Sequence, residues 1–171
     1  LSHHLGVHGI PAYARTERNS AYVLLLGAPR EQLSEAIAYD QLIFARQKYA
    51  LLDELKDLDV GDRISPVLDA LGGKGRYGDL SVEHPDSDEA RQLAGLAKAF
   101  GNALRPALRK RGLLSEKPNE KLPLLHVIFI SNNHLLLASS TAGDRSPWPM
   151  GIPRLRQDTR APSRSAMKLD E

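Results

Sequence analysis

The stretch Leu124–Ser139, with the sequence LLHVIFISNNHLLLAS, decides the fold class. Two apolar runs flank the turn Ser131–His134, a pattern that predicts a β-hairpin. A second hairpin is predicted near the start of the chain, where Pro11–Arg18 and Ala21–Leu26 flank a two-residue turn. Hairpins mixed with helices favour an α+β fold over a doubly wound parallel sheet.

Three helices are expected between the two hairpins. Pro29 opens the first, Ile64–Leu71 forms a short second one, and Asp88–Arg111 forms the longest. Ser87 is a candidate N-cap for the longest helix. Pro106 lies inside it, and we expect this proline to kink or divide the helix because it removes a backbone donor.

Two further strands complete the expected order of elements. Leu42–Leu55 suits a strand that crosses the core and continues into a short connector, and Asp79–His84 alternates as a strand. The predicted order is therefore strand, strand, helix, strand, helix, strand, helix, strand, strand.

The composition excludes several classes of protein. The 171 residues are 42% hydrophobic and 26% charged, which is typical of a globular chain. The absence of cysteine removes disulfide frameworks, thiolate metal sites and cysteine nucleophiles. The longest apolar runs are about half a membrane span, so we expect a soluble, cytoplasmic protein without a membrane partner.

Positive charge is concentrated towards the C-terminus. The whole chain has 23 Lys+Arg against 21 Asp+Glu, but residues 145–168 contain six cations and a single acid, Asp158. The six cations are Arg145, Arg154, Arg156, Arg160, Arg164 and Lys168. Arginine forks two hydrogen bonds onto a phosphate, so this stretch is either a solvated basic linker or a contact for nucleic acid.

Other candidate sites have simpler explanations. His3, His4 and His8 lack acidic partners nearby, so we expect no metal site. Gly72–Arg76 lacks the pattern of a phosphate loop and reads as a helix C-cap, with Lys74 and Arg76 as optional phosphate contacts. No set of nucleophile, base and acid is apparent.

A further group of cations ends the long helix. Arg109, Lys110 and Arg111 complement the helix dipole, and contact with an RNA backbone is the alternative interpretation. Arg164 and Lys168 are four residues apart and repel each other on one helix face unless an anionic partner binds there.

Three blocks of sequence carry a family resemblance. They are Leu42–Gln47 (LIFARQ), Met150–Leu155 (MGIPRL) and Ser163–Glu171 (SRSAMKLDE). In this order and spacing they resemble the bacterial ribosomal RNA large subunit methyltransferase M family, which is FtsJ-like. That resemblance implies S-adenosylmethionine as cofactor and a cytidine ribose of 23S rRNA, or its precursor, as substrate, with no DNA partner and a monomeric state.

The resemblance also implies a division of the chain. Residues 1–56 would form a ferredoxin-like part without its first strand, and residues 57–143 a THUMP-type RNA-binding domain. Residues 144–162 would form a basic linker, and residues 163–171 the first helix of a Rossmann-like methyltransferase domain. The remainder of that domain, with the cofactor loop, would follow Glu171, so we expect this chain alone to bind RNA without methylating it.

By the same resemblance, Lys168 matches the first lysine of the Lys-Asp-Lys-Glu catalytic set. A lysine with a lowered pKa can orient the ribose hydroxyl or accept its proton. Ser163 and Ser165 would border the cofactor pocket. An RNA-binding module of another RNA-modifying enzyme, such as a thiouridine synthase, and a protein-interaction domain that dimerises through its hairpin strands are the alternatives.

Overall fold

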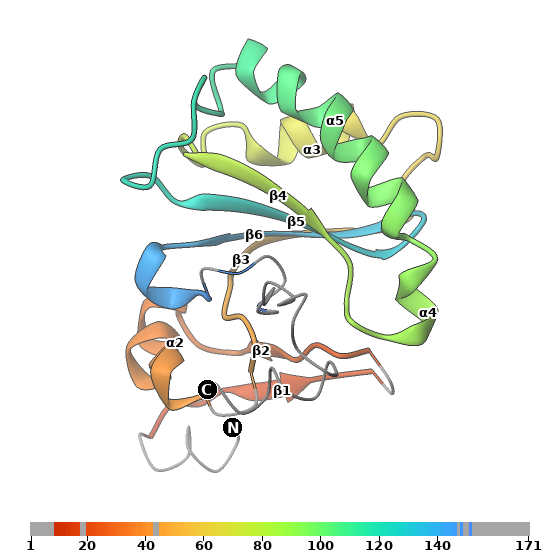
Figure 1. Cartoon of the computed structure of the whole chain (residues 1–171). Helices are drawn as coiled ribbons and strands as arrows, with labels where there is room; N and C mark the ends of the chain where they lie inside the picture. The colour runs from red at the N-terminus through yellow and green to blue at the C-terminus, as the bar shows by residue number, and fades with distance from the viewer. Residues whose placement is uncertain (1–8, 18–19, 43–44, 147, 149–150, 152–171) are drawn as a thin grey trace, which may run out of the picture.

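The fold is built on a four-stranded mixed sheet with the order β3-β6-β5-β4 (Figure 1). The computed structural model describes residues 9–17, 20–42, 45–146, 148 and 151. The strands are β1 (Tyr13–Arg15), β2 (Leu24–Leu26), β3 (Ala50–Leu55), β4 (Asp79–Glu83), β5 (Leu124–Ser131) and β6 (His134–Ser140). The helices are α2 (Arg30–Ala36), α3 (Ile64–Leu71), α4 (Asp88–Arg91) and α5 (Ala94–Lys110), and single 3-10 turns are η1 (Tyr39–Gln41) and η2 (Ala142–Asp144).

The predicted hairpin forms the centre of the sheet. β5 and β6 pair antiparallel, with Val127 opposite Leu137 and Phe129 opposite Leu135. β3 adds antiparallel to β6, and β4 adds parallel to β5. The mixture of hairpins and helices confirms the α+β class predicted from the sequence.

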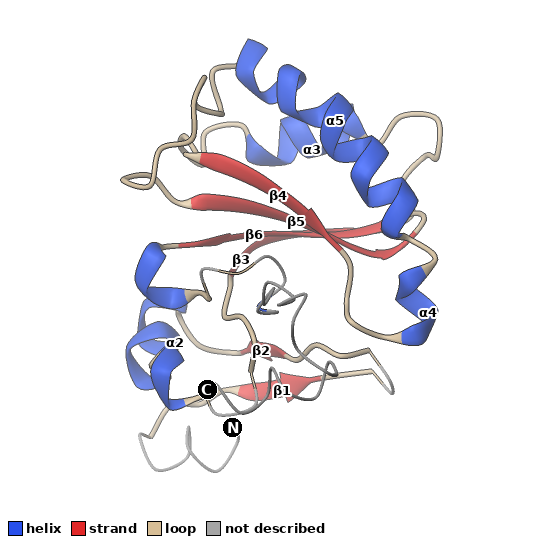
Figure 2. Ribbon diagram, in the orientation of Figure 1, coloured by secondary structure: helices blue, strands red, loops and turns tan. Residues whose placement is uncertain are grey.

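Helices α3 and α5 cover one face of this sheet (Figure 2). Alternate residues of the central hairpin point into that layer, and Leu125, Val127 and Phe129 are fully buried there. The Phe100 ring of α5 meets Phe129 edge-on, with ring centroids 5.2 Å apart. Burial of these apolar side chains between the helices and the sheet supplies the main stabilisation of the fold.

The first hairpin lies on the other side of the sheet. β1 and β2 pair antiparallel, as predicted, and with α2 they form the lower part of the molecule in Figure 1. Arg15 of β1 connects this part to the sheet through a 2.6 Å ion pair with Glu54 of β3. Lys48 adds a second connection, since its ammonium pairs with Asp144 at 3.0 Å and donates to the Ile37 carbonyl.

Two predictions about element boundaries were wrong. Within Leu42–Leu55 the strand occupies only Ala50–Leu55, and before it Gln47 forms an isolated bridge to Arg145. The reason is that polar side chains of residues 46–48 bond to other segments instead of joining a ladder: Arg46 pairs with Asp86, Gln47 bonds to residues 146 and 148, and Lys48 binds Asp144.

The long helix divides at Gln92 and Leu93 rather than at Pro106. Ser87 caps α4, as predicted, by accepting from the Ala90 amide at 3.2 Å, and the Leu93 amide then closes a tight turn onto the Ala90 carbonyl. α5 runs through Pro106 without a break. Leu104 and Leu108 are fully buried on either side of the proline, and their packing holds the helix against the sheet despite the missing hydrogen bond.

The other predicted elements are confirmed. α2, α3 and β4 occupy the expected segments, and left-handed glycines end the helices at Gly73 (φ +75°) and Gly112 (φ +71°). Within the part of the chain that the structure describes, no helix has the length and apolar character needed to cross a membrane.

Truncation of Leu104 to alanine should lower the free energy of unfolding by about 2–5 kcal/mol, because it leaves a cavity between α5 and the sheet. Urea denaturation followed by circular dichroism measures this change. Val60→Ala is the matched control: Val60 is 64% exposed, and its truncation should change stability by less than about 0.5 kcal/mol. Equal effects of the two substitutions would contradict the assigned core.

Candidate functional site

The sheet face turned away from α3 and α5 has a polar character. Strand β4 shows why, because its residues alternate between the two faces. Leu80 and Val82 point to the core, whereas Asp79, Ser81 and Glu83 point to the opposite face. The two least exposed polar residues among those described, His126 and Ser140, lie on this face.

A buried hydrogen-bond network occupies the centre of the polar face. His126 and Glu83 are only 1% and 8% exposed, and His126 Nδ1 lies 3.2 Å from Glu83 Oε1. Because an ionised carboxylate only accepts hydrogen bonds, Nδ1 of the histidine donates. The other ring nitrogen, Nε2, lies 2.7 Å from the Ser140 hydroxyl.

Two hydroxyl groups donate further hydrogen bonds to the Glu83 carboxylate. Ser81 donates to Oε1 at 2.5 Å, and Tyr49 donates to Oε2 at 2.9 Å. The Tyr49 ring also packs against His126, with centroids 4.4 Å apart. Both carboxylate oxygens are therefore satisfied although the group is buried, as buried charge requires.

The network shifts the pKa values of Glu83 and Tyr49. Burial alone would raise the pKa of Glu83, but the hydrogen bonds and the attraction of His126 outweigh burial and hold that pKa below its usual range. Burial raises the pKa of the Tyr49 hydroxyl, and the neighbouring Glu83 carboxylate raises it further. Tyr49 consequently stays protonated and remains a hydrogen-bond donor at neutral pH.

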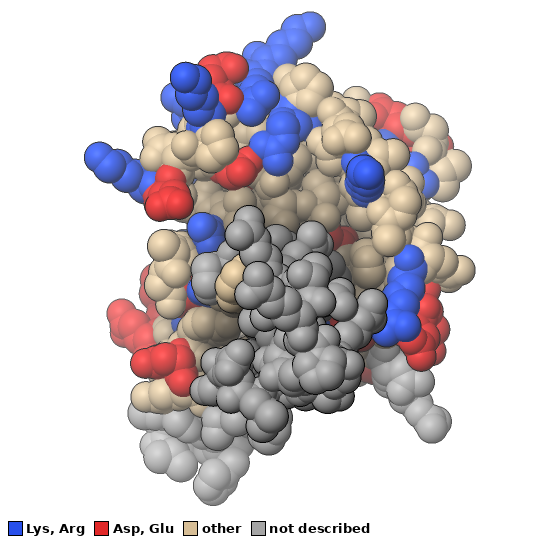
Figure 3. All heavy atoms as spheres, viewed as in Figure 1, with Lys and Arg blue, Asp and Glu red and all other residues tan. Residues whose placement is uncertain are grey.

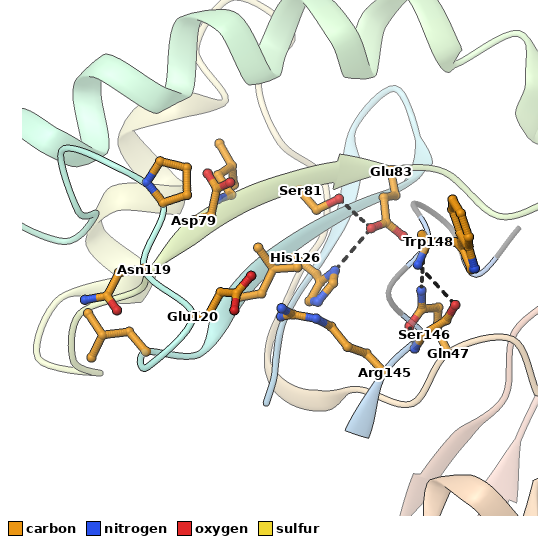
Figure 4. A pocket seen from close by; sticks show the side chains of 14 residues that line it. Gln47, Asp79, Ser81, Glu83, Asn119, Glu120, His126, Arg145, Ser146 and Trp148 are labelled. Carbon is orange, nitrogen blue, oxygen red and sulfur yellow. Dashed lines mark hydrogen bonds and ion pairs between the residues drawn. The ribbon is translucent and has the colours of Figure 1, made fainter. Parts of the chain in front are cut away.

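A cavity of about 270 Å³ opens beside this network. Its walls come from β4, β5, the loop before β5 and the segment after β6, as Figure 4 shows. The polar lining residues are Gln47, Asp79, Ser81, Glu83, Asn119, Glu120, His126, Arg145, Ser146 and Trp148.

The segment after β6 is held in place by Gln47. The Gln47 amide donates to the Trp148 carbonyl at 3.1 Å and accepts from the Ser146 amide at 3.2 Å. The Trp148 amide also donates to the Ser146 hydroxyl, so the backbone at position 148 is bonded at both polar groups. The tryptophan side chain is nevertheless 43% exposed.

The charges around the cavity are only partly paired. Asp79 forms an ion pair with Arg105, and Glu83 is hydrogen-bonded as described above. Arg145 and Glu120 make no side-chain hydrogen bond or ion pair within the described residues. In Figure 4 the Arg145 side chain extends below His126 towards Glu120. As far as the described part of the chain shows, the charged groups of Arg145 and Glu120 are thus open to a ligand.

The cations predicted to contact RNA fall into separate groups. Arg145 lines the cavity, whereas Arg109, Lys110 and Arg111 lie at the end of α5, on the helical side of the sheet. Arg109 donates to the Ser115 carbonyl and Arg111 lies 4.0 Å from Asp69, so both also have structural contacts. Among the described residues visible in Figure 3, cations and acids alternate over this upper part.

Several predicted site residues lie outside the described residues. They are Arg154, Arg156, Arg160, Ser163, Arg164, Ser165 and Lys168, together with His3, His4 and His8. The optional phosphate contact Lys74 is described, and its ammonium bonds to Asp53 at 2.9 Å and to the Leu52 carbonyl. Within the described residues, no group of three His, Asp or Glu side chains is placed to hold a metal ion.

Sequence reasoning missed the buried network and the cavity. The alternation of Asp79, Ser81 and Glu83 along one strand was an available signal, since it predicts a strand whose second face is not apolar. His126 interrupts the apolar run of β5 and was a second signal.

Three proteins of Xanthomonas species that are similar to this chain share one description. Over 163 residues, the chain is 58% identical to ribosomal RNA large subunit methyltransferase M of Xanthomonas campestris pv. campestris (strain B100). The corresponding identities are 56% for the protein of Xanthomonas axonopodis pv. citri (strain 306) and 55% for that of Xanthomonas oryzae pv. oryzae (strain PXO99A). Residues 62–141 match the family described as ribosomal RNA large subunit methyltransferase M, N-terminal. Residues 62–141 of the chain are therefore similar to this family.

The alignments with the methyltransferase M proteins cover 95% of the chain but 47% of each relative. The chain therefore spans about half the length of the curated relatives it matches. The family match covers α3 to β6, and so includes the central hairpin, Glu83 and His126 of the buried network, and most of the cavity wall, but not Tyr49.

Two described residues from the blocks that carry the family resemblance lie against each other. Gly151, from the block Met150–Leu155, adopts φ +67° directly against Arg46, from the block Leu42–Gln47. A Cβ at position 151 would lie 2.3 Å from the Arg46 carbonyl oxygen, so only glycine fits there. Arg46 and Gly151 are about 100 residues apart in sequence, and Gln47 and Trp148, which are close to them in the chain, line the cavity.

Glu83→Gln should remove a pH-dependent part of the stability. The folded-state pKa of Glu83 is lowered, so its contribution is complete above the unfolded value of about 4.3 and is lost as the pH falls through the lower folded value. The difference in unfolding free energy between the natural protein and the variant should therefore shrink as the pH falls from 7 to about 3. Urea titrations at several pH values measure it.

The matched control for this titration is Glu89→Gln. Glu89 is exposed on α4, and its substitution should change stability by less than about 0.5 kcal/mol. A difference for Glu83→Gln that stays constant down to pH 3 would contradict the charged, hydrogen-bonded state assigned to Glu83.

Proposed function

We propose that this chain is the RNA-binding region of an S-adenosylmethionine-dependent methyltransferase that modifies a ribose 2′-hydroxyl, on a cytidine of 23S rRNA. The supporting observation is the 58% identity over 163 residues to a ribosomal RNA large subunit methyltransferase M. Since the relatives are about twice as long, the reaction is completed by a region beyond the part aligned here. The protein acts in the cytoplasm as a monomer.

The roles of its parts follow from this proposal. Residues 1–56 are a ferredoxin-like part, and residues 57–143 are a THUMP-type domain. Its cations Arg109, Lys110 and Arg111 contact RNA phosphates. Residues 144–162 are a basic linker, and residues 163–171 begin the methyltransferase domain that binds most of the cofactor. Ser163 and Ser165 border the cofactor pocket.

Lys168 has the catalytic role in this proposal. S-adenosylmethionine supplies a methyl group on a positively charged sulfur. The ribose 2′-hydroxyl must lose its proton as its oxygen attacks the methyl carbon, while the carbon–sulfur bond breaks and S-adenosylhomocysteine leaves. Lys168 orients that hydroxyl and accepts its proton. A lysine does this at neutral pH when neighbouring cations or burial lower its pKa.

The catalytic role is tested with the full-length natural protein. Lys168→Met should lower the rate of methyl transfer from radiolabelled S-adenosylmethionine to unmodified 23S rRNA by about 10²–10⁴-fold, the usual range for loss of a general base. The dissociation constant for RNA should be almost unchanged. Lys98→Met, in the exposed part of α5, is the control. A full rate in Lys168→Met would rule out this role, and no transfer by the natural protein would refute the proposed activity.

Salt dependence tests the contact with phosphates. If cations of the basic linker (residues 144–162) neutralise about three phosphates, the RNA-binding constant should fall as salt is added. Its logarithm should have a slope of roughly −2 against the logarithm of salt concentration. Affinity for single-stranded rRNA fragments should then drop on the order of 20-fold between 50 and 200 mM salt. Fluorescence anisotropy measures this, and an affinity independent of salt would contradict the proposal.

A further inference from the structure

The cavity on the polar face of the sheet has the features of a binding site rather than of a packing defect. Its volume of about 270 Å³ lies just below the roughly 300–1,000 Å³ of typical small-ligand pockets. Its base is formed by the hydrogen-bonded pair of Glu83 and His126. A rigid, polar floor of this kind resists collapse and keeps the cavity open to a ligand.

The free charges in the cavity indicate what kind of ligand fits. Arg145 is half-buried and Glu120 exposed, and within the described residues neither has a partner for its charged group. A bare phosphate would gain from the arginine but be repelled by the carboxylate. A nucleobase edge, in contrast, presents acceptors to a guanidinium and donors to a carboxylate on neighbouring atoms.

Trp148 adds a surface of a different kind. Its backbone is fixed by Gln47 and Ser146, while the residue as a whole is 43% exposed at the rim of the cavity. In Figure 4 it lies at the end of the cavity opposite Glu120. An exposed aromatic side chain on a fixed backbone is the usual platform on which an unpaired base stacks, and it loses little conformational freedom on binding.

We propose that this cavity holds unpaired RNA: one base enters with its edge between Arg145 and Glu120, and a neighbouring base stacks on Trp148. The inference rests on the proposed function and specifies the RNA as single-stranded at this contact. Base pairing would occupy the edge that Arg145 and Glu120 read and would bury the face that Trp148 covers, so a duplex does not fit. Phosphates are contacted by the other arginines of the basic linker and by Arg109, Lys110 and Arg111.

The test compares two RNA probes on the full-length protein. A fluorescein-labelled single strand of about 12 nucleotides and the matching duplex are titrated in an anisotropy assay. Trp148→Ala should weaken binding of the single strand on the order of 10-fold, the usual effect of losing one stacked base, and leave duplex binding unchanged. Trp148→Phe should retain most of the affinity because it keeps an aromatic face.

Arg145→Lys separates a base contact from a phosphate contact. The substitution keeps the charge but removes the planar fork, so single-strand affinity should fall about 5-fold or more with an unchanged salt slope. Lys98→Ala, on the exposed face of α5, is the control and should bind both probes normally. Thermal unfolding of each variant checks that the fold is intact.

Each result decides between the proposals. If the natural protein binds the single strand and Trp148→Ala and Arg145→Lys bind it equally well, the cavity proposal is wrong and the proposed function stands. An equal loss for single strand and duplex also overturns it, since that result assigns Trp148 a general structural role. If the natural protein binds neither probe and does not methylate rRNA, both proposals fail.

Discussion

The antiparallel pairing of β5 with β6 is the interaction on which the rest of the structure depends. This hairpin contributes both central strands of the four-stranded sheet, and β3 and β4 add to its two outer edges. The two faces of this hairpin contribute to different parts of the structure. Leu125, Val127 and Phe129 bind the helical layer, while His126 lies on the other face and anchors the polar network. A shift of the register by one residue would exchange these two sets, so the apolar core and the candidate site depend on the same pairing.

The candidate site is built from segments that are distant in sequence. Glu83 comes from β4, His126 from β5 and Tyr49 from the residue before β3. The Gln47 amide then brings the segment after β6 against the same face. The family match lies within residues 62–141, yet the rim of the cavity uses residues on both sides of that range. Recognition of RNA at this cavity would therefore require the whole α+β body.

Local patterns predicted most of the fold. The central hairpin, the short helix Ile64–Leu71 and the Ser87 cap are confirmed because turn residues, apolar periodicity and capping are properties of a few neighbouring residues. Pro106 misled the prediction, since its cost is offset by buried leucines whose partners lie elsewhere in the chain. The buried network was not predictable in the same way. His126 and Glu83 are 43 residues apart, and no local rule reveals that adjacent parallel strands place them in contact.

The position of β3 in the sheet has a consequence for synthesis on the ribosome. Leu55 pairs with Leu135, so β3 leaves the ribosome about 80 residues before the strand that completes it. During that interval its backbone groups have no partner, and an unpaired apolar strand would invite association between nascent chains. Asp53 and Glu54 place two charges in the middle of this strand and oppose such association. When the sheet closes, Asp53 pairs with Lys74, and Glu54 pairs with Arg15 and His134. The residues that keep the nascent strand solvated therefore form ion pairs that connect segments of the folded protein.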